Sequence, residues 1–339
     1  MTPEVVDVTL RDGGYVNNWD LSDGDAERIV STLSRAGVPY IEVGYYRPRQ
    51  RRDRAGRRGA ACCPQDYLEV LTRVRRDAQL LVMVHHSEVD RLDYECLADH
   101  GVSRVRLVVS PQSVEGMQEH VPAILAGGLS CSVNLIRISR WSEESLRRVA
   151  RIAEDLGADW IYLADSNGSM FPNQVGHLVA ELRKAVHVRI GFHGHDPLRL
   201  AFANSVIAAQ EGCTLIDSSL GGMGKGVGNL ATELAFTHAR FSSRDPVGSH
   251  TAEMAEVVAA LLDAWLQMPP SRRYAYALAA LLDLSMDDLK DITARGQHPS
   301  SALELVIPEL QLLMTERPHP PHDTGVDFLP VSTLSGSTT

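Results

Sequence analysis

Two histidines separated by a single glycine, His193 and His195, are the residues of this chain best suited to metal chemistry. Successive side chains of a β-strand alternate between its two faces, so both imidazoles point to the same side if the segment is extended. Asp12, which follows Arg11 at the end of another apolar segment, supplies a carboxylate. Two imidazoles and one carboxylate form a facial site that leaves positions open for water or substrate. The pattern therefore predicts a divalent-metal site formed by Asp12, His193 and His195.

Short apolar segments precede most of the polar candidates and read as β-strands. There are eight: Val5–Thr9, Tyr40–Gly44, Leu80–Val84, Val105–Val109, Cys131–Leu135, Trp160–Ala164, Val188–His193 and Thr214–Ser218. Helix-like segments lie between most of them: Asp25–Ala36, Asp66–Arg76, Glu143–Leu156, Pro172–Ala185 and Leu198–Glu211. This alternation predicts a parallel sheet with crossover helices, and eight such units in about 240 residues fit a (β/α)8 TIM barrel, an α/β fold. A doubly wound sheet is the rival, but it usually carries G-x-G-x-x-G after its first strand, and Leu10–Tyr15 does not.

The chain divides into three parts by its pattern. We expect a TIM-barrel catalytic domain over residues 1–245 and a small C-terminal helical appendage over residues 250–315, within which Tyr274–Leu282 reads as a helix. Residues 316–339 are rich in Pro, His, Ser and Thr, and this composition predicts a disordered tail.

The composition is typical of a globular protein and excludes several functional classes. The 339 residues are 44% hydrophobic, and the net charge of −10 argues against a general nucleic-acid-binding protein. The chain contains no run of about 18 apolar residues, the length needed to span a membrane. The first residues lack the basic and apolar regions of a secretory signal. The five cysteines are odd in number and match no zinc spacing, which favours reduced thiols. We therefore expect a cytoplasmic protein with neither a membrane nor a nucleic acid as its partner.

The segment after the last predicted strand is rich in glycine and reads Gly-Gly-Met-Gly-Lys-Gly-Val-Gly-Asn over residues 221–229. It resembles a phosphate cradle, but the P-loop order G-x-x-x-x-G-K-[ST] is absent because Gly226 follows Lys225. Glycines at alternate positions indicate that some group approaches the backbone closely. Asn229 has two readings, a metal ligand through its carbonyl oxygen or the cap of the following helix.

Six motifs occur in an order that points to one family: Thr9–Gly14, Ile41–Gly44, Asp165–Gly168, His193–Asp196, Ala203-Asn204 and Gly224–Asn229. Together they resemble a superfamily of metal-dependent lyase and synthase barrels. Its members include 4-hydroxy-2-oxovalerate aldolase, 3-hydroxy-3-methylglutaryl-CoA lyase and isopropylmalate synthase, and the resemblance covers residues 4–240. The aldolase branch looks nearest, because the synthases typically carry Glu-Gln where this chain has Gly14-Tyr15. The CoA lyases typically carry a cysteine in the glycine-rich segment, and no cysteine follows Cys213 here.

The resemblance implies roles for individual residues. The implied metal ligands are Asp12, His193, His195 and Asn229. The implied catalytic residues are Arg11, which would stabilise a developing enolate, and Tyr15. The implied substrate-binding residues are Arg11, Glu42 and Ser166.

Tyr15 departs from the pattern of the oxovalerate aldolases, which have a histidine at the corresponding place, thought to act as the base. A tyrosine has a pKa near 10 and is a weak base at neutral pH. Tyr15 is therefore expected to be an acid or an orienting group, unless another residue takes the proton. By strand position the other candidates are His85, His86, Tyr45 and Tyr46.

The implied activity is a divalent-metal-dependent carbon–carbon lyase or aldolase that acts through the metal-bound enolate of a pyruvate-like 2-oxo acid, with an aldehyde as partner. A chelated divalent cation serves as the Lewis acid, and Mn²⁺ or Mg²⁺ suits this ligand set better than Zn²⁺. An acyl-CoA-dependent Claisen-type synthase and a non-catalytic binding barrel stay as alternatives. The C-terminal helices have three readings: packing on the barrel, forming a homo-oligomer, or docking a partner enzyme.

A Schiff-base aldolase is disfavoured because it needs a lysine of lowered pKa. The chain has only three lysines, Lys184, Lys225 and Lys290, and only Lys225 is near the expected site. Arginines are concentrated instead in residues 47–58, which contain seven of them. This segment reads either as a solvated loop or as a positive rim that attracts an anionic substrate.

Overall fold

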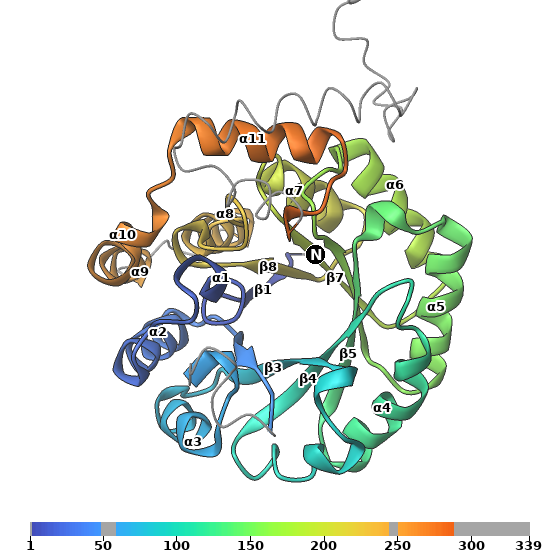
Figure 1. Cartoon of the computed structure of the whole chain (residues 1–339), viewed down its shortest axis with the longest axis horizontal. Helices are drawn as coiled ribbons and strands as arrows, with labels where there is room; N and C mark the ends of the chain where they lie inside the picture. Colours follow the sequence, from blue (N-terminus) through green and yellow to red (C-terminus); the bar gives the residue numbers. More distant parts are fainter. Residues whose placement is uncertain (1, 49–58, 244–249, 288–339) are drawn as a thin grey trace, which may run out of the picture.

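The computed structural model of this chain contains a closed barrel of eight parallel strands that follow one another in sequence order (Figure 1). It describes residues 2–48, 59–243 and 250–287. The strands are β1 (Glu4–Asp7), β2 (Tyr40–Tyr45), β3 (Gln79–His85), β4 (Val102–Val109), β5 (Ser130–Ile136), β6 (Trp160–Asp165), β7 (Arg189–Gly194) and β8 (Leu215–Ser218). The predicted (β/α)8 TIM barrel is confirmed.

Helices cover the outside of the barrel (Figure 1). They are α2 (Asp23–Ala36), α3 (Gln65–Val74), α4 (Glu115–Ala126), α5 (Glu143–Asp155), α6 (Pro172–Arg183), α7 (Ala201–Gln210) and α8 (Thr232–Ser243), with a short α1 (Gly14–Asn17) after β1. The sequence reading did not name α4, which carries Pro122 inside it. Proline removes a helical hydrogen bond and normally argues against a helix, so here burial of one helix face outweighs the local preference.

Local signals set the ends of α2. The Ser22 hydroxyl accepts a hydrogen bond from the Asp25 backbone N–H, and the Asp25 carboxylate accepts one from the Ser22 N–H. This capping box satisfies two backbone donors at the start of the helix. Gly37 ends the helix with φ of 85°, a conformation that favours glycine.

Strand β1 ends at Asp7, two residues before the expected Thr9. The Thr9 hydroxyl accepts a hydrogen bond from the Leu220 N–H at 2.8 Å, and the Asp12 N–H returns to the Val8 carbonyl at 2.8 Å. The chain therefore turns tightly after β1, and this turn carries Asp12 to the end of the barrel.

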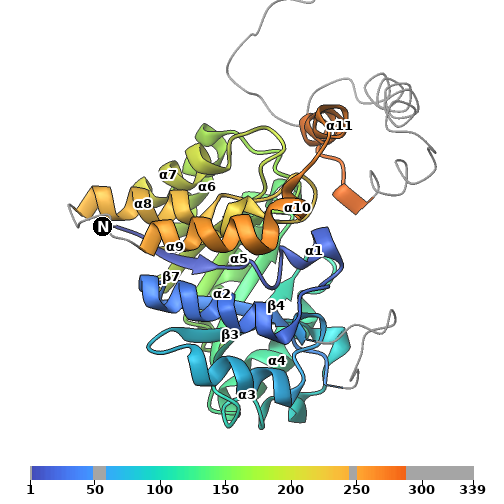
Figure 2. The same ribbon diagram turned by 90° about the vertical axis from the view of Figure 1, so that its left-hand side faces the viewer.

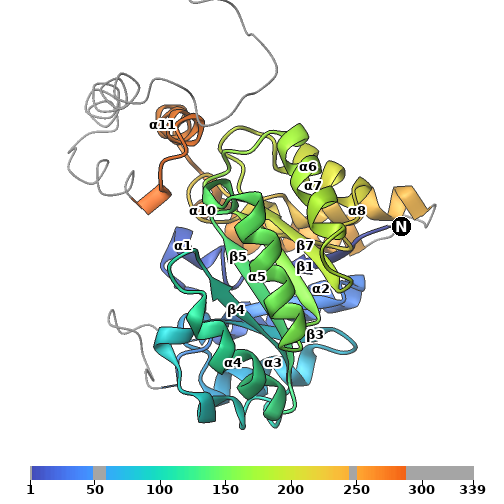
Figure 3. The same ribbon diagram turned by 90° about the vertical axis from the view of Figure 1, so that its right-hand side faces the viewer.

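The C-terminal helices are α9 (His250–Val257), a π-helical turn (Val258–Leu262), α10 (Asp263–Leu266) and α11 (Pro270–Leu281). Met254, Val257 and Leu262 belong to the same buried cluster as the outer layer of the barrel. Figures 2 and 3 show α11 beyond the end of the barrel where α1 also lies. The division into domains at residues 245 and 315 stays a prediction, and the expected tail lies outside the described residues. None of the described helices has the length and apolar character needed to cross a membrane.

A row of buried charges lies inside the barrel. Arg106 on β4 forms ion pairs with Glu42 on β2 at 3.2 Å and with Asp217 on β8 at 2.7 Å, and all three side chains are almost completely buried. Buried charges are tolerated when they are paired and hydrogen-bonded. This row connects three strands directly below the residues of the candidate site.

Candidate active site

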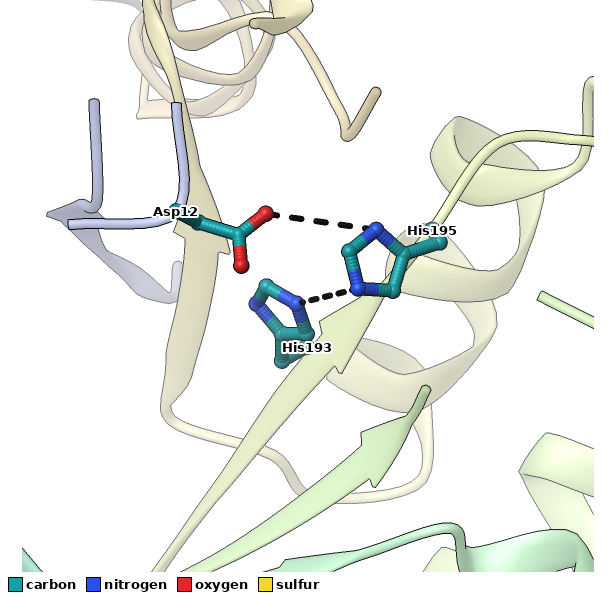
Figure 4. A group of neighbouring side chains, drawn as sticks. All are labelled: Asp12, His193 and His195. Atoms are coloured by element: carbon teal, nitrogen blue, oxygen red, sulfur yellow. Dashed lines mark hydrogen bonds and ion pairs between the residues drawn. The ribbon is translucent and has the colours of Figure 1, made fainter. Parts of the chain in front are cut away.

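Asp12, His193 and His195 converge at the end of the barrel (Figure 4). Each offers one ligand atom, and these atoms all lie within 4.8 Å of one another. The Nε2 atoms of the two histidines are 3.4 Å apart, and Nδ1 of His195 is 4.0 Å from Oδ2 of Asp12. All three residues are buried. A carboxylate and two imidazoles in this arrangement are able to hold a divalent metal ion on one face.

The orientation of His193 is set by Asp217, whose Oδ2 lies 3.1 Å from Nδ1. Burial alone would raise the pKa of Asp217, but the Arg106 guanidinium and the contact with His193 outweigh burial and hold that pKa below its ordinary value. Asp217 is therefore ionised and accepts the Nδ1 proton of His193. With Nδ1 engaged by Asp217, Nε2 of His193 faces His195.

Arg11 connects the triad to the buried charges. Its Nε donates to Glu42 at 2.6 Å and its Nη1 donates to Asp12 at 2.5 Å. Burial alone would raise the pKa of Asp12, but Arg11, and after it the two histidines, hold it well below the usual range. Asp12 is therefore a carboxylate at any ordinary pH. Glu42, expected to bind substrate, is fully buried, and Arg11 and Arg106 occupy its carboxylate.

A cavity of about 200 Å³ opens at the triad. Its lining residues are Arg11, Asp12, Tyr15, Tyr45, Met83, His85, Val108, Asn134, Ile136, Arg137, Ala164, Ser166, His193, His195, Lys225 and Asp287. Six of the expected site residues are among them. Glu42 and Asn229 are not.

Asn229 contacts the carboxylate of Asp12. Its amide nitrogen donates to Oδ2 of Asp12 at 2.8 Å, and its carbonyl oxygen has no hydrogen-bond partner in the described part of the chain. In this orientation the amide nitrogen supports the carboxylate, and a role of Asn229 as a metal ligand stays a prediction. The close approach expected of the glycine-rich segment is explained, because a Cβ at Gly224 would lie 2.3 Å from the Asn229 side chain. The group that approaches the backbone is thus part of the protein itself.

Tyr15 and Tyr45 line the cavity with their hydroxyl oxygens 2.9 Å apart. Burial and the neighbouring Tyr45 raise the pKa of Tyr15 well above its ordinary value. Tyr15 is therefore a hydrogen-bond donor at neutral pH and not a base.

Among the other base candidates, only His85 and Tyr45 line the cavity. The His85 ring stacks on Tyr45 with centroids 5.6 Å apart, and burial lowers its pKa. His85 is thus a neutral imidazole at neutral pH. Tyr46 donates to the Asp93 carbonyl at 2.8 Å, and a Cβ at Gly116 on α4 would lie 2.6 Å from the His86 ring.

Three residues of the site were missed by the sequence reading: Arg106, Arg137 and Asp217. The signal for Arg106 and Asp217 was available, because a charge inside an otherwise apolar strand must find a buried partner. No sequence pattern marks Arg137 as a site residue, because its place in the cavity lining depends on a left-handed backbone conformation. Ser166, expected to contact a substrate carboxylate, accepts a hydrogen bond from the Arg137 N–H at 3.0 Å.

The described lysines are both paired. Lys184 forms an ion pair with Glu181 on the outside of the barrel, and Nζ of Lys225 lies 2.6 Å from Asp287. Lys290 and the arginines within residues 49–58 lie outside the described residues. Neither described lysine is desolvated and unpaired, as a Schiff-base nucleophile requires.

Comparison with known proteins gives a consistent result. A family model described as HMGL-like matches residues 2–257. The oxaloacetate decarboxylase of Mycobacterium tuberculosis is 32% identical over 232 residues, which cover 68% of each chain. The 4-hydroxy-2-oxovalerate aldolase of Brevibacillus brevis is 32% identical over 240 residues, which cover 69% of each chain.

Two solved structures share the fold. The N-terminal domain of a candidate aldolase from Bacteroides vulgatus is 26% identical with a TM-score of 0.78, over 90% of this chain and 99% of that one. The carboxyl transferase domain of Rhizobium etli pyruvate carboxylase, solved with pyruvate, is 16% identical with a TM-score of 0.73, over 92% and 56% of the two chains. At that identity the second likeness concerns the fold alone.

Proposed function

This chain belongs to the HMGL-like family, and from that premise we propose that it is a divalent-metal-dependent carbon–carbon lyase of the aldolase type. Its substrate is a pyruvate-like 2-oxo acid, released from or joined to an aldehyde. The observation that carries this proposal is the convergence of Asp12, His193 and His195 beside Arg11 in one small cavity. The named relatives, an aldolase and a decarboxylase of 2-oxo acids, support the same chemistry.

The geometry of Asp12, His193 and His195 fits a divalent metal ion. Nδ1 of His195 and Oδ1 of Asn229 are buried next to the triad without hydrogen-bond partners among the residues described. The two imidazoles, with their Nε2 atoms 3.4 Å apart, are also well arranged to share a cation. Asp12, His193 and His195 would hold the ion, for which we propose Mn²⁺ or Mg²⁺ because a carboxylate and positions open to water and substrate oxygens suit these ions. When bound, the ion supplies Lewis acidity to the carbonyl and carboxylate oxygens of the 2-oxo acid.

In the cleavage direction a base removes the proton of the 4-hydroxyl group, whose oxygen electrons form the carbonyl of the departing aldehyde. The C3–C4 bond breaks, and its electron pair remains on the 2-oxo acid as an enolate, which takes a proton at C3. Arg11 contributes a fixed positive charge at the developing enolate oxygen. We assign the base to His85, which is neutral at neutral pH and lines the cavity. Tyr15 and Tyr45 donate hydrogen bonds that orient the substrate.

Decarboxylation of a 2-oxo acid is a second candidate, supported by the relative named oxaloacetate decarboxylase. Loss of CO₂ from C4 of an oxaloacetate-like acid leaves the same enolate and requires no acceptor for a hydroxyl proton. An acyl-CoA-dependent synthase is less well supported, because the cavity of about 200 Å³ is smaller than the pockets that hold drug-sized ligands. A non-catalytic barrel would have no reason to keep the triad in a chelating arrangement.

The test is exchange of the methyl protons of pyruvate in D₂O, followed by NMR with the Mn²⁺- or Mg²⁺-loaded protein. Exchange reports enolisation without knowledge of the aldehyde. We expect exchange that depends on the metal and is lost in an Asp12→Ala variant. No exchange above the protein-free rate in the fully loaded protein would overturn the proposal.

A further inference from the structure

Arg137 follows the last residue of β5 and lines the cavity. Its backbone has φ of 56° and ψ of 48°, the left-handed region that residues other than glycine and asparagine rarely adopt. Ser166 holds this conformation, because its hydroxyl accepts the Arg137 N–H at 3.0 Å. The Arg137 carbonyl in turn accepts the N–H of Arg140 at 2.9 Å. Unusual backbone conformations of this kind persist where surrounding structure supports them and are frequent at ligand-binding sites.

The charge of Arg137 has no counterpart in the cavity, unlike the other cations there. Arg11 is paired with Asp12 and Glu42, and Lys225 is paired with Asp287. Within residues 2–48, 59–243 and 250–287 no carboxylate or carbonyl group accepts a hydrogen bond from the Arg137 guanidinium. A guanidinium is strongly suited to a carboxylate, because its planar fork donates two parallel hydrogen bonds.

Arg137 lies across the barrel from Asp12, one member of the triad. β5 and β1 are on opposite sides of the eight-stranded ring, so Arg137 and Asp12 reach the cavity from opposite sides (Figure 1). A substrate whose 2-oxo acid end lies beside Asp12 and which extends across the cavity would therefore have its far end near Arg137. Met83, Val108 and Ile136 contribute apolar side chains to the same lining, and these side chains offer a charged group no partner.

We propose that Arg137 binds a second carboxylate at the far end of the substrate, so that the substrate is a 4-hydroxy-2-oxo acid with a carboxylate on C4. This inference rests on the proposed function and names its substrate class. Cleavage then gives pyruvate and an aldehyde that bears a carboxylate. The carboxylate on C4 is one carbon too far from the 2-oxo group for its loss as CO₂ to leave an enolate, whereas breaking the C3–C4 bond does leave one. A substrate of this class is therefore suited to aldol cleavage and not to decarboxylation.

The first experiment measures binding, which does not depend on turnover. The probes are 2-oxoglutarate and 2-oxopentanoate, which have the same chain length and differ in the terminal carboxylate. Calorimetric titration of the metal-loaded protein should show tighter binding of 2-oxoglutarate. Arg137→Gln should weaken binding of 2-oxoglutarate by about 10- to 100-fold, the range for a hydrogen-bonded charged group, and change binding of 2-oxopentanoate by less than about threefold. Arg137→Lys keeps the charge and should retain part of the preference.

The matched control is Arg148→Gln, which removes the same charge from an exposed position on α5 outside the barrel. It should leave both affinities unchanged. The second experiment compares kcat/KM for cleavage of 4-hydroxy-2-oxoglutarate and 4-hydroxy-2-oxovalerate. Arg137→Gln should remove a preference for the first compound.

The outcomes separate this inference from the proposed function. Equal losses for both probes in Arg137→Gln, or no loss for either, would overturn the role of Arg137 even if pyruvate exchange proceeds. A selective loss of 2-oxoglutarate binding in a protein that does not exchange pyruvate protons would support the carboxylate site and overturn the lyase proposal.

Discussion

Asp217 accepts a hydrogen bond from Nδ1 of His193 at 3.1 Å, and this contact determines which nitrogen of the histidine is available to a metal ion. The carboxylate is ionised, because Arg106 and His193 together outweigh burial and lower its pKa. Asp217 thereby engages Nδ1 of His193 and leaves Nε2 available to a metal ion. Partners of this kind raise the basicity of a metal-binding histidine and fix its ring orientation.

The first prediction concerns this partner. Asp217→Asn keeps the size of the side chain but removes the charge that fixes the proton of His193. We expect metal affinity to fall by about 10- to 100-fold, measured by titration of the metal-free protein. Loss of the ion pair with Arg106 should also lower the thermal midpoint. Unchanged metal affinity in a folded variant would contradict a role for Asp217 in orienting the ligand.

The second prediction is metal dependence. Treatment with EDTA should abolish pyruvate proton exchange, and Mg²⁺ or Mn²⁺ should restore it. His193→Ala and His195→Ala should lose bound metal, measured by elemental analysis, and should keep the circular dichroism of the barrel because both residues lie at its mouth. Full activity in a sample shown to contain no metal would be incompatible with the proposal.

The third prediction concerns Arg11. Lysine keeps the charge but cannot donate from separate nitrogens to Glu42 and Asp12, as Arg11 does at 2.6 and 2.5 Å. Arg11→Lys should lower kcat by about 10²- to 10³-fold, the scale for loss of one oxyanion donor, and should change metal affinity much less. Steady-state kinetics and metal titration on the same preparation distinguish the two effects. A near-normal kcat would show that Arg11 has a structural role alone.

The fourth prediction tests the base. His85→Gln should lower kcat for aldol cleavage by about 10²- to 10⁴-fold, the usual contribution of general base catalysis. His86→Gln is the matched control, because His86 is the next residue in the chain and does not line the cavity. It should stay within about threefold of the parent enzyme. Equal effects of the two substitutions would assign the proton transfer to another group.

The fifth prediction is a pH dependence of stability. Burial lowers the pKa of His195 to about 3 in the folded protein, against 6.5 for an ordinary imidazole. The unfolded chain therefore binds this proton more tightly, so stability is fully present above pH 6.5 and is lost as the pH falls toward 3. In metal-free protein, unfolding free energies should fall between pH 6.5 and 4 more steeply than in His195→Gln, by up to about 1.4 kcal/mol per pH unit.

Urea unfolding of both proteins at several pH values gives this comparison. The buried carboxyls of Asp7 and Asp165, whose pKa values burial raises to about 6, act in the opposite direction. They are common to both proteins and cancel in the difference. Equal slopes for the two proteins would show that His195 is not held as a buried neutral imidazole.

The sequence by itself determined the order of the strands, most of the helices and the side on which His193 and His195 lie. These features depend on local physics, namely the alternation of side chains along a strand and the caps and breaks of helices. Because parallel strands of a barrel all end at the same face, the sequence also predicted that Asp12 would meet the histidines.

Only the tertiary structure decided what the supporting residues do. Glu42 was expected to meet substrate, but its partners Arg11 and Arg106 are 31 and 64 positions away in the chain, and no local rule assigns such pairs. The direction in which Arg137 leaves β5 depends on a left-handed backbone conformation, which Ser166, the residue after β6, stabilises by a hydrogen bond. The protonation states of two residues also depend on the closed barrel. It brings Arg106 to Asp217, which stays charged, and it buries His195, which stays neutral.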